Sequence, residues 1–94
     1  MYLIRFYVGA NKAIMAGRAG RALTASDDLL IEIYGGFTRY DAKGRWKQDL
    51  EEWTIVYEVI SESAENERAA VFLRDKWEQD AVLVTVQAVE SRLV

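Results

Sequence analysis

The chain has 94 residues, of which 51% are hydrophobic and 29% charged, a balance typical of a globular domain rather than a disordered segment. It contains no cysteine and no histidine. These absences exclude disulfides, thiol nucleophiles, the usual zinc sites and the commonest general base. We therefore expect a single domain over residues 1–94 that needs no metal or cofactor, and we favour a protein that is not an enzyme.

The charge of the chain is unevenly distributed. Residues 1–47 carry eight basic and four acidic side chains, whereas residues 48–94 carry four basic and eleven acidic ones, for a net charge of −3. This balance argues against nucleic-acid binding, which requires an excess of lysine and arginine. We interpret the two halves as complementary surfaces, either within one fold or between copies of the chain.

Two features of the sequence concern cellular location. The first residues lack the basic region, long apolar core and cleavage site of a signal peptide. No apolar run approaches the roughly 20 residues that a membrane span requires. We therefore predict a cytoplasmic protein that does not bind membranes.

The chain begins with a predicted strand. Residues 2–8 alternate aromatic and β-branched side chains around a single charge, as is typical of a buried strand. The alternation places Ile4 and Phe6 on one face and Arg5 and Tyr7 on the other.

One helix is predicted in the first half of the chain. Residues 9–23 are rich in alanine but are interrupted by glycine, so we expect a loop or one weak helical turn there. A serine and two aspartates at positions 26–28 can cap a helix and complement its dipole. The pattern predicts a helix over residues 27–34, which ends at Gly35.

The second half of the chain predicts three strands and a helix. Residues 37–46 and 53–60 are aromatic and β-branched runs on either side of a polar segment, which favours an antiparallel hairpin. Residues 67–79 place apolar groups at helical spacing, so we expect a second helix with Trp77 in the core. Residues 81–89 are rich in valine and predict a final strand.

The resulting order is β-α-β-β-α-β. It predicts an α+β ferredoxin-like plait, in which a four-stranded antiparallel sheet carries two helices on one face. The opposite face of the sheet then has no helix to cover it, so it must be polar or bind a partner.

Several short motifs support a resemblance to a known group of proteins. They are Gly36-Phe37-Thr38, Gly44-Arg45-Trp46, the opening Tyr7-Val8-Gly9-Ala10-Asn11 and the late Ala81-Val82-Leu83-Val84. Outside residues 12–25, the chain resembles small uncharacterised bacteriophage and prophage proteins. The resemblance implies a ferredoxin-like domain, a phage or mobile-element origin and a place in the host cytoplasm, but no catalytic residue. Small phage proteins often act by binding, for example as counter-defence inhibitors that block a host protein or sequester a signalling molecule.

Cationic and aromatic side chains gather around the second predicted strand. The group consists of Tyr40, Lys43, Arg45 and Trp46, with Arg5 and Tyr7 on the first strand. An arginine can pair with a phosphate while an aromatic ring stacks on a base. The group therefore predicts a binding site for an anionic nucleotide-like ligand or a host protein. The alternative is that the rings pack within the protein and the charges are solvated.

A second cationic group, Lys12, Arg18 and Arg21, lies in the glycine-interrupted stretch. Its backbone could approach an anion closely beside a helix start. The spacing is not that of a phosphate-binding P-loop, and Asp27 and Asp28 would oppose an anion. The alternative interpretation is a mobile surface loop.

Arg5 and Glu58 fall on predicted neighbouring strands, and we expect them to form an ion pair across the bare face of the sheet. The alternative is a small polar pocket that they share with Tyr7 and Thr85. Leu3 and Val56 belong to the same face, which offers too few aromatic rings for RNA bases to stack on.

The bare face is better suited to another protein surface. Plaits often pair sheet to sheet, and the segment after Val89 could extend a neighbour's sheet, so we expect a homodimer or a larger ring. The predicted function is non-catalytic binding. One alternative is a small dimeric plait-type enzyme that acts on a hydrophobic or carbonyl compound with Glu58 as a buried acid, and another is a structural protein of a phage particle.

Overall fold

The computed structural model describes the backbone of residues 1–46 and 50–94 and the side chains of residues 1–45 and 51–94. Four strands and three helices follow one another along the chain. They are β1 (Tyr2–Gly9), α1 (Asn11–Met15), α2 (Ala19–Tyr34), β2 (Thr38–Trp46), β3 (Leu50–Ser61), α3 (Glu67–Lys76) and β4 (Leu83–Ala88).

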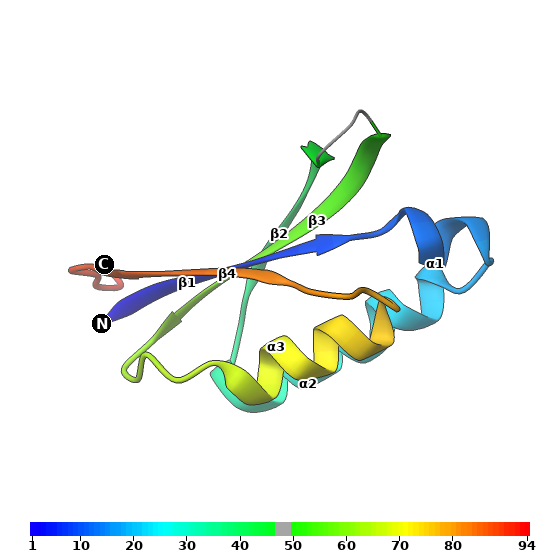
Figure 1. Cartoon of the computed structure of the whole chain (residues 1–94). Helices are drawn as coiled ribbons and strands as arrows, with labels where there is room; N and C mark the ends of the chain where they lie inside the picture. Colours follow the sequence, from blue (N-terminus) through cyan, green and yellow to red (C-terminus); the bar gives the residue numbers. More distant parts are fainter. Residues whose placement is uncertain (47–49) are drawn as a thin grey trace.

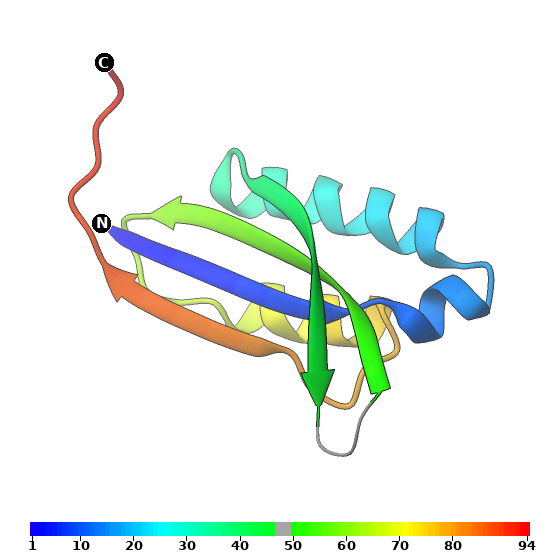
Figure 2. The ribbon, with the colours of Figure 1, turned by 90° about the horizontal axis from the view of Figure 1, so that it is seen from above.

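The strands form one antiparallel sheet in the order β2-β3-β1-β4. Strands β1 and β3 are central, and β2 and β4 are the two edges. Helices α2 and α3 lie side by side beneath one face of this sheet (Figures 1 and 2). This is the predicted α+β ferredoxin-like plait, with the short helix α1 added before α2.

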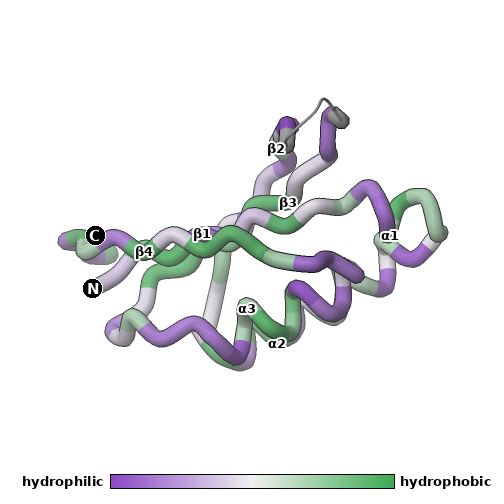
Figure 3. Tube along the Cα trace, viewed as in Figure 1, coloured by the Kyte–Doolittle hydropathy of each residue, from purple (hydrophilic) through white to green (hydrophobic). Residues whose placement is uncertain are grey.

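The core lies between the sheet and the two long helices. Alternate residues of β1, among them Ile4 and Phe6, are fully buried on the helix side. Leu30 of α2 and Leu73 of α3 meet them from below, and Trp77 is 1% exposed at the end of α3. The prediction that Trp77 lies in the core is therefore confirmed. Green hydrophobic segments follow the central strands, while α3 is mixed with purple, as expected for a helix with one buried side (Figure 3).

The predicted start of the first helix is wrong. Residues 9–23 are not a loop, because they contain α1 and the first turns of α2, which begins at Ala19. Gly17 lies between the two helices with φ of 72°, and Gly20 is in the first turn of α2, so neither glycine interrupts a helix interior. Gly35 does end α2 as predicted, with φ of 80°.

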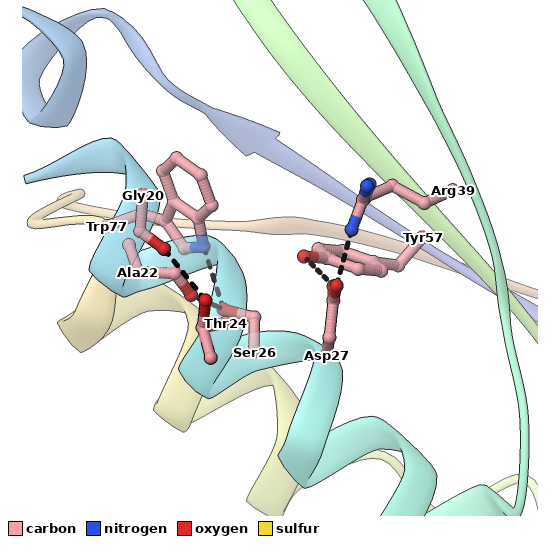
Figure 4. Close-up of polar contacts among 8 residues, drawn as sticks. All are labelled: Gly20, Ala22, Thr24, Ser26, Asp27, Arg39, Tyr57 and Trp77. Carbon is pink, nitrogen blue, oxygen red and sulfur yellow. Dashed lines mark hydrogen bonds and ion pairs between the residues drawn. The ribbon is translucent and has the colours of Figure 1, made fainter.

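Ser26 and Asp27 are interior residues of α2 rather than its cap. The Ser26 hydroxyl donates a hydrogen bond of 2.6 Å to the Ala22 carbonyl and accepts one of 2.9 Å from the Trp77 indole N–H. Asp27 accepts a 2.9 Å bond from the Tyr57 hydroxyl and pairs with Arg39 of β2 (Figure 4). These contacts connect α2 to α3 and to the sheet. The polar residues that the sequence predicts as a helix start therefore hold the layers together.

The remaining elements agree with the predicted ones to within a few residues. Strand β3 begins earlier than expected, at Leu50, and α3 ends at Lys76 rather than at residue 79. No helix among the described residues is long and apolar enough to cross a membrane.

Candidate functional site

The face of the sheet opposite the helices, here called the open face, is the candidate site. Cross-strand partners share a face, so the strand registers define its members. They include Leu3, Arg5, Tyr7, Gly9, Thr38, Tyr40, Ala42, Thr54, Val56, Glu58, Ile60, Leu83, Thr85 and Gln87. The sequence placed Leu3, Arg5, Tyr7, Val56 and Glu58 together on this face, and the structure confirms that placement.

A charged cluster occupies the centre of the open face. Arg5 and Glu58 are direct cross-strand partners on β1 and β3, and the Arg5 Nε donates to Glu58 Oε2 at 2.6 Å. The Tyr40 hydroxyl of β2 donates to the same carboxylate oxygen at 3.1 Å. The predicted ion pair is therefore present, and one tyrosine of the predicted cationic–aromatic group joins it.

The electrostatics of this cluster keep Glu58 ionised. The bond from Arg5 is the largest influence and lowers the pKa of Glu58, and the bond from Tyr40 lowers it further. Desolvation raises the pKa of Tyr40, and its bond to Glu58 adds to the effect. A general acid near neutral pH needs a raised carboxyl pKa, so this environment does not prepare Glu58 for that role.

Apolar side chains lie before and after the charged cluster along the strands, while its neighbours across the strands are Thr38 and Thr85. Val56 is fully buried although no helix lies over it. On this side the twisted hairpin of β2 and β3 rises from the sheet and crosses in front of β1 (Figures 1 and 2). Further out, Ile60 is 42% exposed and Leu83 is 48% exposed. The open face therefore has a neutralised centre and an apolar margin.

The other members of the cationic–aromatic group do not join the cluster. Lys43 is the cross-strand partner of Trp53, on the side of β2 that faces away from Tyr40, and its amino group lies 5.3 Å from the centre of the Trp53 ring. Arg45 is exposed on the same side as Lys43. Trp46 ends β2, but its side chain lies outside the described residues.

The predicted anion-binding loop is made of helices instead. Lys12 lies in α1 and Arg21 in α2, and both are exposed. Arg18, between the helices, forms a bidentate pair with Glu78 at 2.8 and 2.9 Å. That pair lowers the pKa of Glu78 and fastens the start of α2 to the end of α3, so Arg18 already has a carboxylate partner.

A pocket of about 570 Å³ that the sequence did not reveal lies where β1 ends and β4 begins. It is lined by Tyr7, Gly9, Glu52 and residues 79–83. A Cβ at Gly9 would lie 1.8 Å from Glu52 Oε1 and 2.5 Å from Gln79 Oε1, so glycine is required where these side chains close over the strand. The glycine ending a buried strand was the only sequence signal for this site. No group of three potential metal ligands occurs among residues 1–46 and 50–94.

Comparison with known proteins identifies the fold alone. No protein-family model matches the chain, and no curated protein is detectably similar to it. Among solved structures, the chain is similar to a DUF3240 family protein from Shewanella baltica OS155, with a TM-score of 0.60 and 11% sequence identity over 99% of this chain and 94% of that one. The similarity supports the ferredoxin-like architecture, and at this identity it carries no function.

Proposed function

We propose that this chain is a non-catalytic binding protein that engages another protein through the open face. The observation that carries the proposal is the combination of a neutralised centre and an apolar margin. Arg5 and Glu58 satisfy each other, so a partner does not have to supply a counter-charge, while Ile60 and Leu83 leave apolar surface for it to cover. Apolar surface bordered by polar groups is typical of protein interaction sites.

The chemistry of the open face favours a protein over an anionic nucleotide. The cations expected to bind such a ligand are separated or engaged: Arg5 binds Glu58, Lys43 lies on the other side of β2, and Arg18 binds Glu78. A partner with a mixed apolar and uncharged polar surface fits better. A host protein, as the resemblance to phage proteins implies, is the partner class that we propose.

The proposal can be tested by photo-crosslinking in living cells. A photoreactive phenylalanine analogue replaces Ile60 on the open face in one variant and Val71 on α3 in a matched control. The two positions have similar exposed fractions, 42% and 39%, and lie on opposite layers of the molecule. We expect adducts with another protein from position 60 and few from position 71.

A partner identified in this way should bind the purified chain directly. Replacing Leu83 with glutamate places a charge in the apolar margin and should weaken that binding by about tenfold or more. Equal crosslinking from both positions, or undiminished binding by the Leu83→Glu variant with unchanged circular dichroism, would refute the proposal.

A further inference from the structure

Strand β4 presents an edge to which another strand can be added. It is the last strand in the sheet order, so one row of its backbone groups has no neighbouring strand among the described residues. The Val89 N–H donates to the Met1 carbonyl at 3.0 Å. Since hydrogen-bonding residues alternate along an antiparallel strand, this bond shows that the backbone groups of Val84, Val86 and Ala88 point outward.

The edge also lacks the features that protect exposed strands. Charged side chains, proline and bulges usually prevent edge pairing, but the six residues of β4 read Leu-Val-Thr-Val-Gln-Ala. Its pairing with β1 is continuous over six residues, from Leu83 to Ala88. Val86, near the middle, is 43% exposed. An uncharged, regular edge of this kind is suited to adding a strand.

We propose that two copies of this chain pair through their β4 edges, antiparallel about a two-fold axis at Val86, and that the segment after β4 of each copy lies against the pocket of the other. In this register Val86 faces Val86 of the second copy, and Val84 faces its Ala88. All of these residues direct their N–H and C=O groups outward, so each facing pair forms two hydrogen bonds. The product is a continuous eight-stranded sheet.

Charge complementarity selects this register among those that the backbone allows. Asp80 lies in the bend before β4, and Arg92 follows β4; extending the register about Val86 to both residues brings Asp80 of each copy opposite Arg92 of the other. With the axis at Val84, Asp80 would face Ala88 instead. With the axis at Ala88, Arg92 would face Val84. Opposite charges placed directly across two strands stabilise their pairing, and the axis at Val86 forms two such pairs in each dimer.

The pocket beside β4 provides the place for the exchanged segment. Its lining includes the carboxylates of Glu52 and Asp80 together with an apolar wall from residues 81–83. Arg92 is followed by Leu93 and Val94, whose side chains are fully exposed in the single chain. In Figure 2 the segment after β4 turns away from the direction of β4 and passes the N-terminus before it reaches the end of the chain. In the dimer it continues along the strand direction, so Arg92 meets the carboxylates and Val89 lies opposite Leu83 of the apolar wall.

The first test removes one outward hydrogen bond. Val86→Pro eliminates an N–H that points away from β1, so the ladder with β1 is kept, and Val86→Ala is the control that keeps the N–H. Sedimentation equilibrium should show dimers for the wild type and Val86→Ala, and monomers with an unchanged circular dichroism spectrum for Val86→Pro. A monomeric wild type at millimolar concentration, or a dimeric Val86→Pro variant, would overturn the proposal.

The second test exchanges the paired charges. Asp80→Arg or Arg92→Asp alone places two like-charge pairs in the interface, and each should raise the dimer dissociation constant by about tenfold. The double variant restores both attractions and should return it to within about threefold of the wild-type value. Failure of the double variant to recover would exclude the register centred on Val86. These tests concern pairing of the chain with itself. Leu83 belongs to both surfaces, so crosslinking from position 60, which lies away from the pocket, tests the open-face proposal separately.

Discussion

Two hydroxyl groups on α2 show how burial decides the role of a single residue. Thr24 and Ser26 each donate a hydrogen bond to the carbonyl four residues earlier, at 3.1 and 2.6 Å. Thr24 is exposed, whereas Ser26 is fully buried and also accepts the bond from the Trp77 indole (Figure 4). The local backbone bond is the same, so only the tertiary partner separates the two residues.

This difference leads to a prediction at the scale of the residue. Ser26→Ala leaves the buried Trp77 N–H without an acceptor, and we expect the free energy of unfolding to fall by about 1–3 kcal/mol. Thr24→Ala, its matched control, removes only the exposed local bond and should change stability by no more than about 0.5 kcal/mol. Urea unfolding of both variants measures the difference. Equal losses would mean that the contact with Trp77 contributes nothing.

At the scale of the element, α2 is longer than the sequence predicts, because it begins at Ala19 rather than at residue 27. Its buried stripe consists of Ala22, Ser26 and Leu30, spaced four residues apart as expected for one face of a helix. Alanine and serine are weak hydrophobic signals, so the stripe did not stand out beside the glycines. Small side chains are needed here because α2 packs closely against α3, where Trp77 fills the space between them.

The two glycines flanking the start of α2 provide a prediction at this scale. Neither Gly17 nor Gly20 has an atom within 4 Å of an added Cβ, but Gly17 has φ of 72° whereas Gly20 is helical. Gly20→Ala should therefore stabilise the protein by up to about 1 kcal/mol. Gly17→Ala should destabilise it by about 1–2 kcal/mol, because an alanine is strained in the left-handed region. Thermal unfolding checks both, and effects of the same sign would contradict the assigned start of α2.

At the scale of the whole molecule, ion pairs join the two halves of the chain. Arg5 pairs with Glu58 and Arg18 with Glu78, so basic residues of the first half meet acidic residues of the second. Arg68 of the second half pairs with Glu32 of the first, and two further pairs each lie within one half. Two of the five ion pairs among the described residues therefore follow the interpretation of the unequal halves as complementary surfaces. The pairing of Asp80 with Arg92 would add a complementary contact between copies.

The helices and the sheet should consequently unfold together. Ser26 binds Trp77 of the second half while Asp27, its neighbour, binds Tyr57, so neither layer can separate without breaking a shared network. We expect one transition with coincident midpoints for helix circular dichroism and for Trp77 fluorescence, measured in a variant with Trp46 and Trp53 replaced by phenylalanine. Loss of the helix signal at lower denaturant than the fluorescence would contradict this expectation.

The sequence by itself determined the ferredoxin-like order of elements and the two faces of the central strands. Alternation in β1 assigned Ile4 and Phe6 to the core and Arg5 to the open face, because a strand turns successive side chains to opposite sides. The same alternation paired Arg5 with Glu58 correctly. These features depend on the two-residue periodicity of side chains in a strand, which can be read directly from the sequence.

Only the tertiary structure decided the true start of α2, the separation of Lys43 from Tyr40, and the pocket beside β4. Each depends on contacts between segments distant in sequence: Ser26 with Trp77, the register of β2 on β3, and Glu52 and Gln79 closing over Gly9. Local propensity cannot report such contacts, since the same serine can cap a helix or bind a tryptophan 51 residues away.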